Sequence, residues 1–374
     1  MKSAMGIILA GDRNNRLREL TAVRSVSAIP VGGKYRAIDF TLSNMVNSGI
    51  TNIGVLTQYN FRSLMDHLGS GKEWDLDRKN DGLYIFPPFL TEDDSDNWYR
   101  GSADAMYHNI TFLRRSNEDY VVITKGNSIY KMLYDEMLSF HKEKNADITV
   151  AYMDMNDYTN DELKMLGLMK LDDNGKILDF QEKPLHPWTS LGSIGIYIIE
   201  REKLISLLEE SAAHGDYDFV KDILIKKLGV LNIFGFKFEG YWRNLNSIQI
   251  YYKCNMEMLD IDIRRQLFSE NGKVYTKVKD EAPAKYSKEA EVKNSLIADG
   301  CFIEGTVENS VLFRRVTVGK GAVVKNSIVM QGTSIEDGAT LEYAILDKNV
   351  VFTSGKYLKG EPSWPIIVGR KVRV

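Results

Sequence analysis

The sequence is poor in cysteine and histidine. Its 374 residues include two cysteines, Cys254 and Cys301, and five histidines. The two cysteines have no metal-binding spacing and imply no disulfide framework, so a reducing cytoplasm is the expected location. The histidines are scattered along the chain (His67, His108, His141, His186 and His214), which disfavours a zinc site.

Long apolar runs and an excess of basic residues are also missing. No stretch of 18 apolar residues occurs, and the run at residues 5–9 is too short and too closely followed by charges for a signal peptide. The formal net charge is −3. Nucleic acids and anionic membranes usually require a basic excess, so the sequence predicts neither as a partner.

The length allows two domains, and the first apolar segment organises the chain. Residues 5–9 form a short apolar run, typical of a central strand of a parallel sheet, and Gly11 ends it. A polar turn follows before an amphipathic stretch begins at Leu17. A strand, a small-residue loop and a helix in this order usually grip a nucleotide phosphate. This loop, however, contains one glycine, an aspartate and two asparagines, which are poor phosphate ligands.

Residues 1–253 alternate short apolar runs with longer helical patterns. Strands are predicted at 53–57, 120–124, 148–152 and 193–199, and helices at 40–48, 103–113, 132–144 and 202–210. This alternation indicates βαβ units and a mostly parallel sheet with helices on both faces. Such sheets bind ligands at the carboxyl ends of their strands.

The end of the chain is repetitive. Residues 254–290, with a short helix at 256–260, are interpreted as a linker, and 291–374 as a coil. Within the coil, similar segments begin at Asn309, Asn326 and Tyr343, each 17 positions after the last. Apolar residues recur every six positions, and glycines mark the corners. Hexad periodicity predicts a parallel β-helix. The apolar positions are Leu312, Val318, Val324, Val329, Ile335, Leu341, Leu346 and Phe352.

Three stretches carry a family resemblance. They are VGGKYRAIDFTLSNMVNSGI (31–50), WYRGSADAMYHNI (98–110), and FQEKP (180–184) followed by SIGIY (193–197). With the hexads, they make the chain similar to glucose-1-phosphate adenylyltransferases over nearly its whole length. The resemblance implies a nucleotidyltransferase-like (Rossmann-like) α/β domain and a left-handed parallel β-helix.

Compared with the family pattern, the phosphate loop is degenerate. Gly11, Arg16 and Leu17 match the family loop, but Asp12 and Asn14 replace glycines. Asp12 would place a negative charge where a polyphosphate should lie, although capping of the following helix is its favoured role. Downstream, Val26 stands where the family has a lysine, so a phosphate-binding cation is lost.

The expected metal site departs further from the family pattern. The resemblance places aspartates at Asn127 and Asn244, and both are neutral amides here. Magnesium sites rely on carboxylates, so we expect no metal and no catalytic residue in this chain. Both asparagines are also compatible with simple turn positions. The alternative is an active enzyme in which Asp104 or another carboxylate has taken over metal binding.

Other positions match the family. The resemblance implies sugar-phosphate contacts at Glu182, Lys183, Ser193 and Tyr197. It implies vestigial nucleotide contacts at Gly11, Arg16, Gln58, Gly101 and Ser102. It also places Lys34 and Arg36 in a segment that binds anionic effectors. The alternative is that Gly32 and Gly33 form an ordinary turn and that Lys34 and Arg36 are simply exposed to solvent.

The resemblance points to the regulatory, GlgD-type subunit of the family. Such a subunit would assemble with a catalytic partner as a heterotetramer and activate or tune it. It would respond to sugar-phosphate effectors, while the partner holds the magnesium. An acyltransferase, which hexad coils often accompany, is disfavoured because no histidine follows His214.

Overall fold

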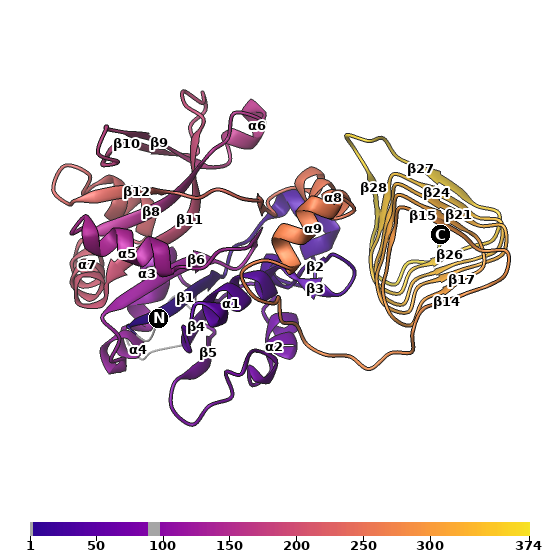
Figure 1. Ribbon diagram of the computed structural model, residues 1–374, viewed down its shortest axis with the longest axis horizontal. Coiled ribbons are helices and arrows are strands. Elements are labelled where there is room, and N and C mark those ends of the chain that lie inside the picture. Colours follow the sequence, from indigo (N-terminus) through magenta and orange to yellow (C-terminus); the bar gives the residue numbers. More distant parts are fainter. Residues whose placement is uncertain (1–2, 89–97) are drawn as a thin grey trace.

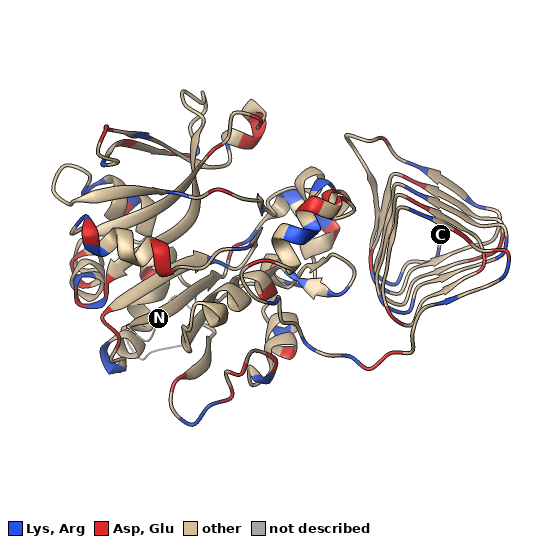
Figure 2. Ribbon diagram, viewed as in Figure 1, with Lys and Arg blue, Asp and Glu red and all other residues tan. Residues whose placement is uncertain are grey.

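The computed structural model describes residues 3–88 and 98–374. An N-terminal α/β part is followed by a C-terminal coil of short strands that is triangular in cross-section (Figure 1). Charged residues of both signs are spread over both parts (Figure 2). Within the described residues, no helix combines the length and apolar character that a membrane crossing requires.

The central sheet is built around β1 (Ala4–Ala10), which is buried along almost its whole length. It pairs in parallel with β4 (Asn52–Thr57) and β6 (Tyr120–Lys125), so the prediction of a central parallel strand is confirmed. The sheet order is β10-β9-β11-β6-β1-β4-β5, with β8 paired to β11 and β12 paired to β8. The other strands are β5 (Gly82–Phe86), β8 (Ile148–Asp154), β9 (Gly167–Leu171), β10 (Ile177–Glu182), β11 (Leu191–Glu200) and β12 (Ile233–Lys237).

The sheet is antiparallel around β11, which runs against both β6 and β8. The register of β11 against β8 shifts between Ser193 and Tyr197, where Gly195 has a φ of 75°. A side chain at this φ would be strained, so glycine permits the irregularity. The shift lies at the end of β11 that faces the ligand side of the sheet.

Helices cover both faces of the sheet (Figure 1). The predicted helix at 103–113 is two helices, because the Asn109 side chain bonds the Ala105 carbonyl (2.8 Å) and thereby competes with the helical pattern. The helices are α1 (Ala37–Asn47), α2 (Arg62–Leu68), α3 (Ser102–His108), α4 (Ile110–Arg115), α5 (Asp135–Glu143), α6 (Asn160–Leu163) and α7 (Arg201–His214).

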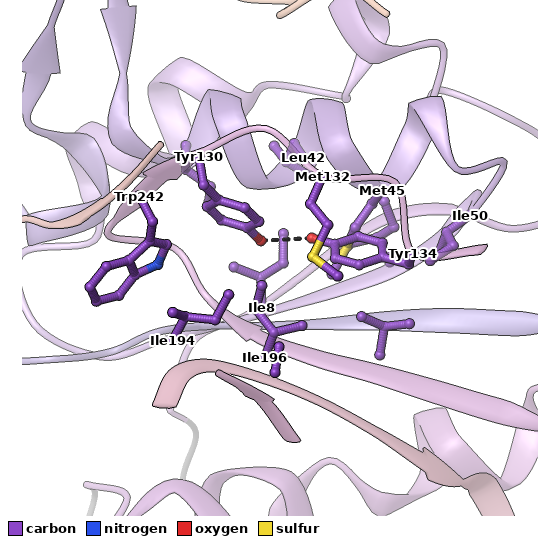
Figure 3. Close-up of a cluster of buried hydrophobic side chains, with 14 of the residues drawn as sticks. Ile8, Leu42, Met45, Ile50, Tyr130, Met132, Tyr134, Ile194, Ile196 and Trp242 are labelled. Atoms are coloured by element: carbon purple, nitrogen blue, oxygen red, sulfur yellow. Dashed lines mark hydrogen bonds between the residues drawn. The ribbon is translucent and has the colours of Figure 1, made fainter. Parts of the chain in front are cut away.

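One apolar cluster fixes the segment that follows β6. Tyr130 and Tyr134 lie among Ile8 of β1 and Ile194 and Ile196 of β11, and their hydroxyls are 2.7 Å apart (Figure 3). Tyr130 ends β7 (Ser128–Tyr130), so its burial anchors this short strand against the sheet. The residues directly before β7 are held in place as a result.

The segment predicted as a linker contains ordered helix. After α8 (Ile248–Glu257), α9 (Ile261–Phe268) buries Leu267 and stacks Phe268 on Tyr35, with ring centroids 5.0 Å apart. The first strand of the coil, β14 (Lys285–Tyr286), begins six residues before the predicted start of the coil. Only one residue of α9 is fully buried, so hydrophobic periodicity in the sequence could not predict this helix.

The coil has three faces, each a parallel sheet, and is a parallel β-helix of the left-handed, hexapeptide-repeat kind. All eight predicted hexad residues are buried inside it. Serine hydroxyls connect successive turns: Ser295 accepts from the Ser310 N–H, Ser310 from Ser327 and Ser327 from Ala344, at 3.1–3.2 Å.

The strands of the three faces follow. One face comprises β14, β17 (Phe302–Ile303), β20 (Thr317–Val318), β23 (Ser334–Ile335) and β26 (Val351–Phe352); the second comprises β15 (Glu291–Lys293), β18 (Thr306–Glu308), β21 (Val323–Lys325), β24 (Thr340–Glu342) and β27 (Tyr357–Lys359); the third comprises β16 (Leu296–Ile297), β19 (Val311–Leu312), β22 (Ile328–Val329), β25 (Ala344–Leu346) and β28 (Ile366–Val368).

The coil packs against the α/β part through a shared apolar cluster that contains Leu17, Val26, Phe313 and Ile345. A buried ion pair lies at the same junction. The Arg24 Nη2 contacts both carboxylate oxygens of Asp347, at 2.8 and 2.9 Å. Apolar contact and paired charge together fix the two parts against each other.

Candidate functional site

A cavity of about 510 Å³, called the central cavity below, opens at the carboxyl ends of β1, β4 and β6. This is where sheets of this class bind ligands. Its charged lining residues are Asp12, Arg13, Arg16, Arg100, Lys125, Glu182, Lys183 and Asp218; its polar ones include Gln58, Ser102, Asn127, Asn244 and Asn246.

Asn14, rather than the predicted Asp12, caps the helix after β1. Its Oδ1 accepts from the Arg16 N–H (2.9 Å) at the start of the 3₁₀ helix η1 (Asn15–Thr21). Asn14 directly precedes that helix, whereas Asp12 lies two residues further back. The Asn14 Nδ2 also donates to the Asn246 carbonyl (2.8 Å), which ties the loop to the opposite wall.

Lys125, which the sequence reading missed, ends β6 inside the central cavity. Burial lowers the pKa of its ammonium, but the carboxylate of Asp12, with Tyr197, Glu182 and Asp218, outweighs burial and raises the pKa above its ordinary value. Lys125 is therefore a fixed positive charge. Its position at the carboxyl end of a central strand was the available signal.

The predicted nucleotide contacts Gly11, Arg16, Gln58, Gly101 and Ser102 all line the central cavity. Several of them hold its wall together. Gln58 donates to the Tyr99 carbonyl (2.9 Å), and Ser102 accepts from the Phe219 N–H (2.9 Å). A Cβ on Gly101 would lie 2.4 Å from a backbone oxygen, so only glycine fits there.

On the predicted sugar-phosphate side, Glu182, Lys183 and Tyr197 line the central cavity. Ser193 is buried and does not belong to the lining; its Oγ accepts a hydrogen bond from the Gly195 N–H (3.3 Å). Burial raises the pKa of Tyr197 to about 12, so its hydroxyl stays protonated. Lys183 has a φ of 54°, an uncommon conformation for a residue with a side chain, and its side chain is 60% exposed toward the opening.

Asn127 and Asn244 lie side by side. β13 (Trp242–Asn244) pairs antiparallel with β7, and the Leu245 N–H donates to the Asn127 carbonyl (3.0 Å). The side-chain oxygens of Asn127, Asn244 and Asn246 are buried and have no hydrogen-bond partner. All three residues line the central cavity, but these oxygens themselves are covered from solvent.

These residues do not suit a divalent metal ion. Magnesium sites use carboxylates, and the described residues contain no group of three His, Cys, Asp or Glu placed to hold a metal. The alternative ligand Asp104 is buried, bonds Arg100 at 2.9 Å and is not part of the cavity lining.

Val26 does not line the central cavity. It is 2% exposed and belongs to the apolar cluster that includes Leu17 and Leu20. Val26 begins the 3₁₀ helix η2 (Val26–Ala28). Together with Asp12, Arg13 and Asn14 it also lines a hollow beside the phosphate loop.

A second hollow, called the interdomain pocket below, has a volume of about 270 Å³ and lies between the α/β part and the coil. The predicted residues Lys34 and Arg36 line it, beside a hairpin whose turn contains Gly32 and Gly33. The coil and the segment leading to it add further cations that the sequence did not single out. These are Lys277, Lys279, Arg314 and Lys348.

Positive charge is crowded in the interdomain pocket. Burial, with the nearby charges of Arg36 and Arg24, lowers the pKa of Lys348 to about 7. Burial lowers the pKa of Arg36 to about 10. Arg314 is buried, and its Nε–H has no hydrogen-bond partner. A pocket of this kind is built to receive an anion.

The fold and the two hollows are those of a nucleotidyltransferase domain joined to a hexapeptide-repeat coil. Residues 5–261 match the family described as nucleotidyl transferase, and residues 281–360 match the GlmU-like, C-terminal hexapeptide family. The chain belongs to the glucose-1-phosphate adenylyltransferase family, as relatives bearing that name show.

Three of these relatives illustrate the likeness. The protein from Clostridium perfringens (strain SM101) is 42% identical over 339 residues, which are 90% of this chain and 86% of the relative. That from Thermosipho africanus is 44% identical over 327 residues (87% and 78%). That from Bacillus cytotoxicus is 38% identical over 370 residues (98% and 97%).

Proposed function

We propose that this chain is a regulatory, catalytically impaired subunit of glucose-1-phosphate adenylyltransferase. The reaction joins ATP and glucose-1-phosphate to give ADP-glucose and diphosphate. Attack on the α-phosphorus builds up negative charge, which a divalent ion held by carboxylates usually stabilises. The observation that carries the proposal is the pair of neutral amides, Asn127 and Asn244, at the carboxyl end of the sheet.

In this proposal the chain assembles with a catalytic subunit as a heterotetramer in the cytoplasm and changes its activity or effector response. The catalytic partner supplies the magnesium site. The free, buried state of Cys254 and Cys301 agrees with a reducing compartment. The proposal includes neither a nucleic acid nor a membrane as a partner.

The interdomain pocket supports a regulatory role. It joins Arg36 of the α/β part to Arg314 and Lys348 of the coil, so an anion bound there contacts both parts of the chain. A phosphorylated sugar that binds more tightly to one arrangement of the two parts would shift the population toward it. This is a physical route from an effector to the subunit contacts.

The first test is a turnover assay of the purified chain with ATP, glucose-1-phosphate and magnesium. We expect a rate at least about 1,000-fold below that of a catalytic relative, because the loss of metal-borne charge stabilisation is worth several kcal/mol. The same relative is then assayed with and without this chain. A rise in its activity or a changed effector response, with co-purification of the two chains, supports the proposal.

The rival function is an active enzyme with relocated metal ligands. Asp12, Glu182 and Asp218 favour it, since their carboxylates line the central cavity. Turnover near that of the catalytic relative, abolished by Asp12→Asn or Asp218→Asn, would establish this rival and end the regulatory proposal. Restoring aspartate at positions 127 and 244 should recover activity only in part, because Asp12 still faces the triphosphate.

A further inference from the structure

We propose that a groove between β5 and α4 binds a neutral oligosaccharide. This groove, called the edge groove below, has a volume of about 1,110 Å³ and lies where β5 ends the central sheet (Figure 1). Its described lining residues are all different from those of the central cavity and the interdomain pocket. The edge groove is therefore a separate surface, and its ligand does not depend on the proposed function.

Three aromatic side chains form the apolar surface of the edge groove. The rings of Tyr84 and Phe86 on β5 are nearly parallel, with centroids 6.3 Å apart and an interplanar angle of 9°. Phe112 of α4 contacts both rings, at 5.2 Å in each case. Gly54 of β4 makes room for Phe112, because a Cβ there would lie 2.7 Å from its ring. Tyr84 is 42% exposed, so part of this aromatic surface is accessible to a ligand.

The rest of the edge groove is polar. Among the described lining residues there is no leucine, isoleucine, valine or methionine, and Ala4 is the one aliphatic residue. A groove that takes an amphipathic helix is hydrophobic, and the core of a protein interface is depleted of lysine, aspartate and glutamate. The composition therefore disfavours a protein partner. The neutral polar lining residues are Thr51, Asn52, Asn80, Asn109, Thr111, Ser116 and Asn117.

The charges of the edge groove nearly cancel. Arg78 forms an ion pair with Asp75, and His108 lies 3.7 Å from the carboxylate of Asp104, which would offset its charge when protonated. The other described charged lining residues are two cations and two carboxylates: Lys79, Arg115, Asp81 and Glu118. Nucleic acids and other polyanions bind where positive charge is in excess. The edge groove therefore favours an uncharged ligand.

An oligosaccharide matches both features. One side of a sugar ring presents C–H groups, which pack on the electron-rich face of an aromatic ring. Its edge presents hydroxyl groups, each of which is both a donor and an acceptor. The amides and carboxylates of the groove, with Arg115, supply partners of both kinds. The volume of about 1,110 Å³, against about 510 Å³ for the central cavity, accommodates several sugar units instead of one.

The test is titration calorimetry of the full chain with maltoheptaose and, separately, with cellohexaose. We expect one of these neutral oligosaccharides to bind with a Kd below about 1 mM. Raising the salt concentration about tenfold should change this Kd less than about twofold, because the ligand carries no charge. Glucose should bind at least about tenfold more weakly, since it covers only part of the groove. Absence of binding by both oligosaccharides overturns the proposal.

Variants at Tyr84 locate the site. Tyr84→Ala should raise the Kd at least about tenfold, whereas Tyr84→Phe keeps the ring face and should stay within about threefold. The matched control is Tyr357→Ala, which removes a tyrosine that is 64% exposed on the coil and should leave the Kd unchanged. Circular dichroism checks the fold of each variant. Unchanged binding by a folded Tyr84→Ala chain, or an equal loss in the control, contradicts the proposed site.

A second variant leaves the aromatic contacts intact. Arg115 is exposed on α4, so Arg115→Ala should preserve the fold while removing donors from the groove. Its Kd should rise about three- to tenfold. If Tyr84→Ala fails to fold, an unchanged Kd in Arg115→Ala decides against the proposal.

Docking of a protein is the competing use of the edge groove. Loss of co-purification with a catalytic relative in Tyr84→Ala, without oligosaccharide binding by the unmodified chain, would establish that use and end this proposal. Activation of the relative is measured independently. A chain that activates it but binds no oligosaccharide refutes this proposal alone, and a chain that binds oligosaccharide without activating the relative refutes the proposed function alone.

Discussion

The two hollows of this molecule differ in how they use charge. The central cavity balances cations against carboxylates and presents neutral amides beside them, while the interdomain pocket collects lysines and arginines around few acids. In the central cavity the pKa of Lys125 is raised above its ordinary value, whereas in the interdomain pocket the pKa of Lys348 is lowered. The charges of the first hollow are therefore largely paired, whereas the second has an excess of positive charge.

The difference shows that the two hollows of one chain depend on different interactions. Backbone and amide hydrogen bonds build the wall of the central cavity. The interdomain pocket brings together charges from several segments. The following predictions act on the junction between the two parts and on its pocket, and leave the central cavity as the reference.

The largest effect is expected from the buried ion pair at the junction. Asp347→Ala leaves the Arg24 guanidinium buried and unpaired, which should lower the free energy of unfolding by about 3–5 kcal/mol. Urea denaturation measures this. The double change Arg24→Met/Asp347→Leu removes both charges and should cost much less; an equal loss would show that packing, not the unpaired charge, is responsible.

The next effect concerns anion affinity. Arg314→Ala/Lys348→Ala removes two cations from the interdomain pocket and should weaken binding of a sugar bisphosphate there about 10- to 100-fold. Calorimetry measures it, with glucose-1-phosphate in the central cavity as the internal reference. The control Lys320→Ala/Lys356→Ala removes exposed lysines of the coil outside the pocket. A loss of similar size in this control would assign the effect to general electrostatics.

The smallest effect is the pH dependence of that pocket. Because the pKa of Lys348 is about 7, much of this side chain is neutral at pH 8 and charged at pH 6. A bound anion favours the charged form, so binding takes up a proton and weakens as pH rises through 7. Sulfate, which does not titrate in this range, should bind about tenfold more weakly at pH 8 than at pH 6. Lys348→Met should flatten the profile; an unchanged slope contradicts the assignment.

Much of the fold could be predicted because its signals are local and periodic. The strand β1 and the buried hexads each follow from apolar spacing alone. The helix α9 could not, since one buried leucine leaves little pattern. The cap at Asn14 instead of Asp12 depended on where η1 begins, which the sequence leaves uncertain by a few residues.

The residues of the two sites could be predicted where they lie in one contiguous sequence motif. Gly101, Ser102 and Lys183 belong to short matching stretches and do line the central cavity. Arg314 and Lys348 lie far from Lys34 in the chain and come together only when the coil docks. The burial of Val26 likewise depends on that docking. Contacts between distant segments leave no local signal.

The serine-linked coil has a consequence for how such chains can change length. Within the coil, each turn bonds to the turns directly above and below it through the same hydroxyl and backbone groups. Away from the turns that dock on the α/β part, a whole rung could therefore be inserted or deleted with repair needed only at its two neighbours. The corner asparagines Asn294 and Asn309 are 15 residues apart where the next pair is 17 apart, so one rung has already absorbed a shorter corner without losing its register.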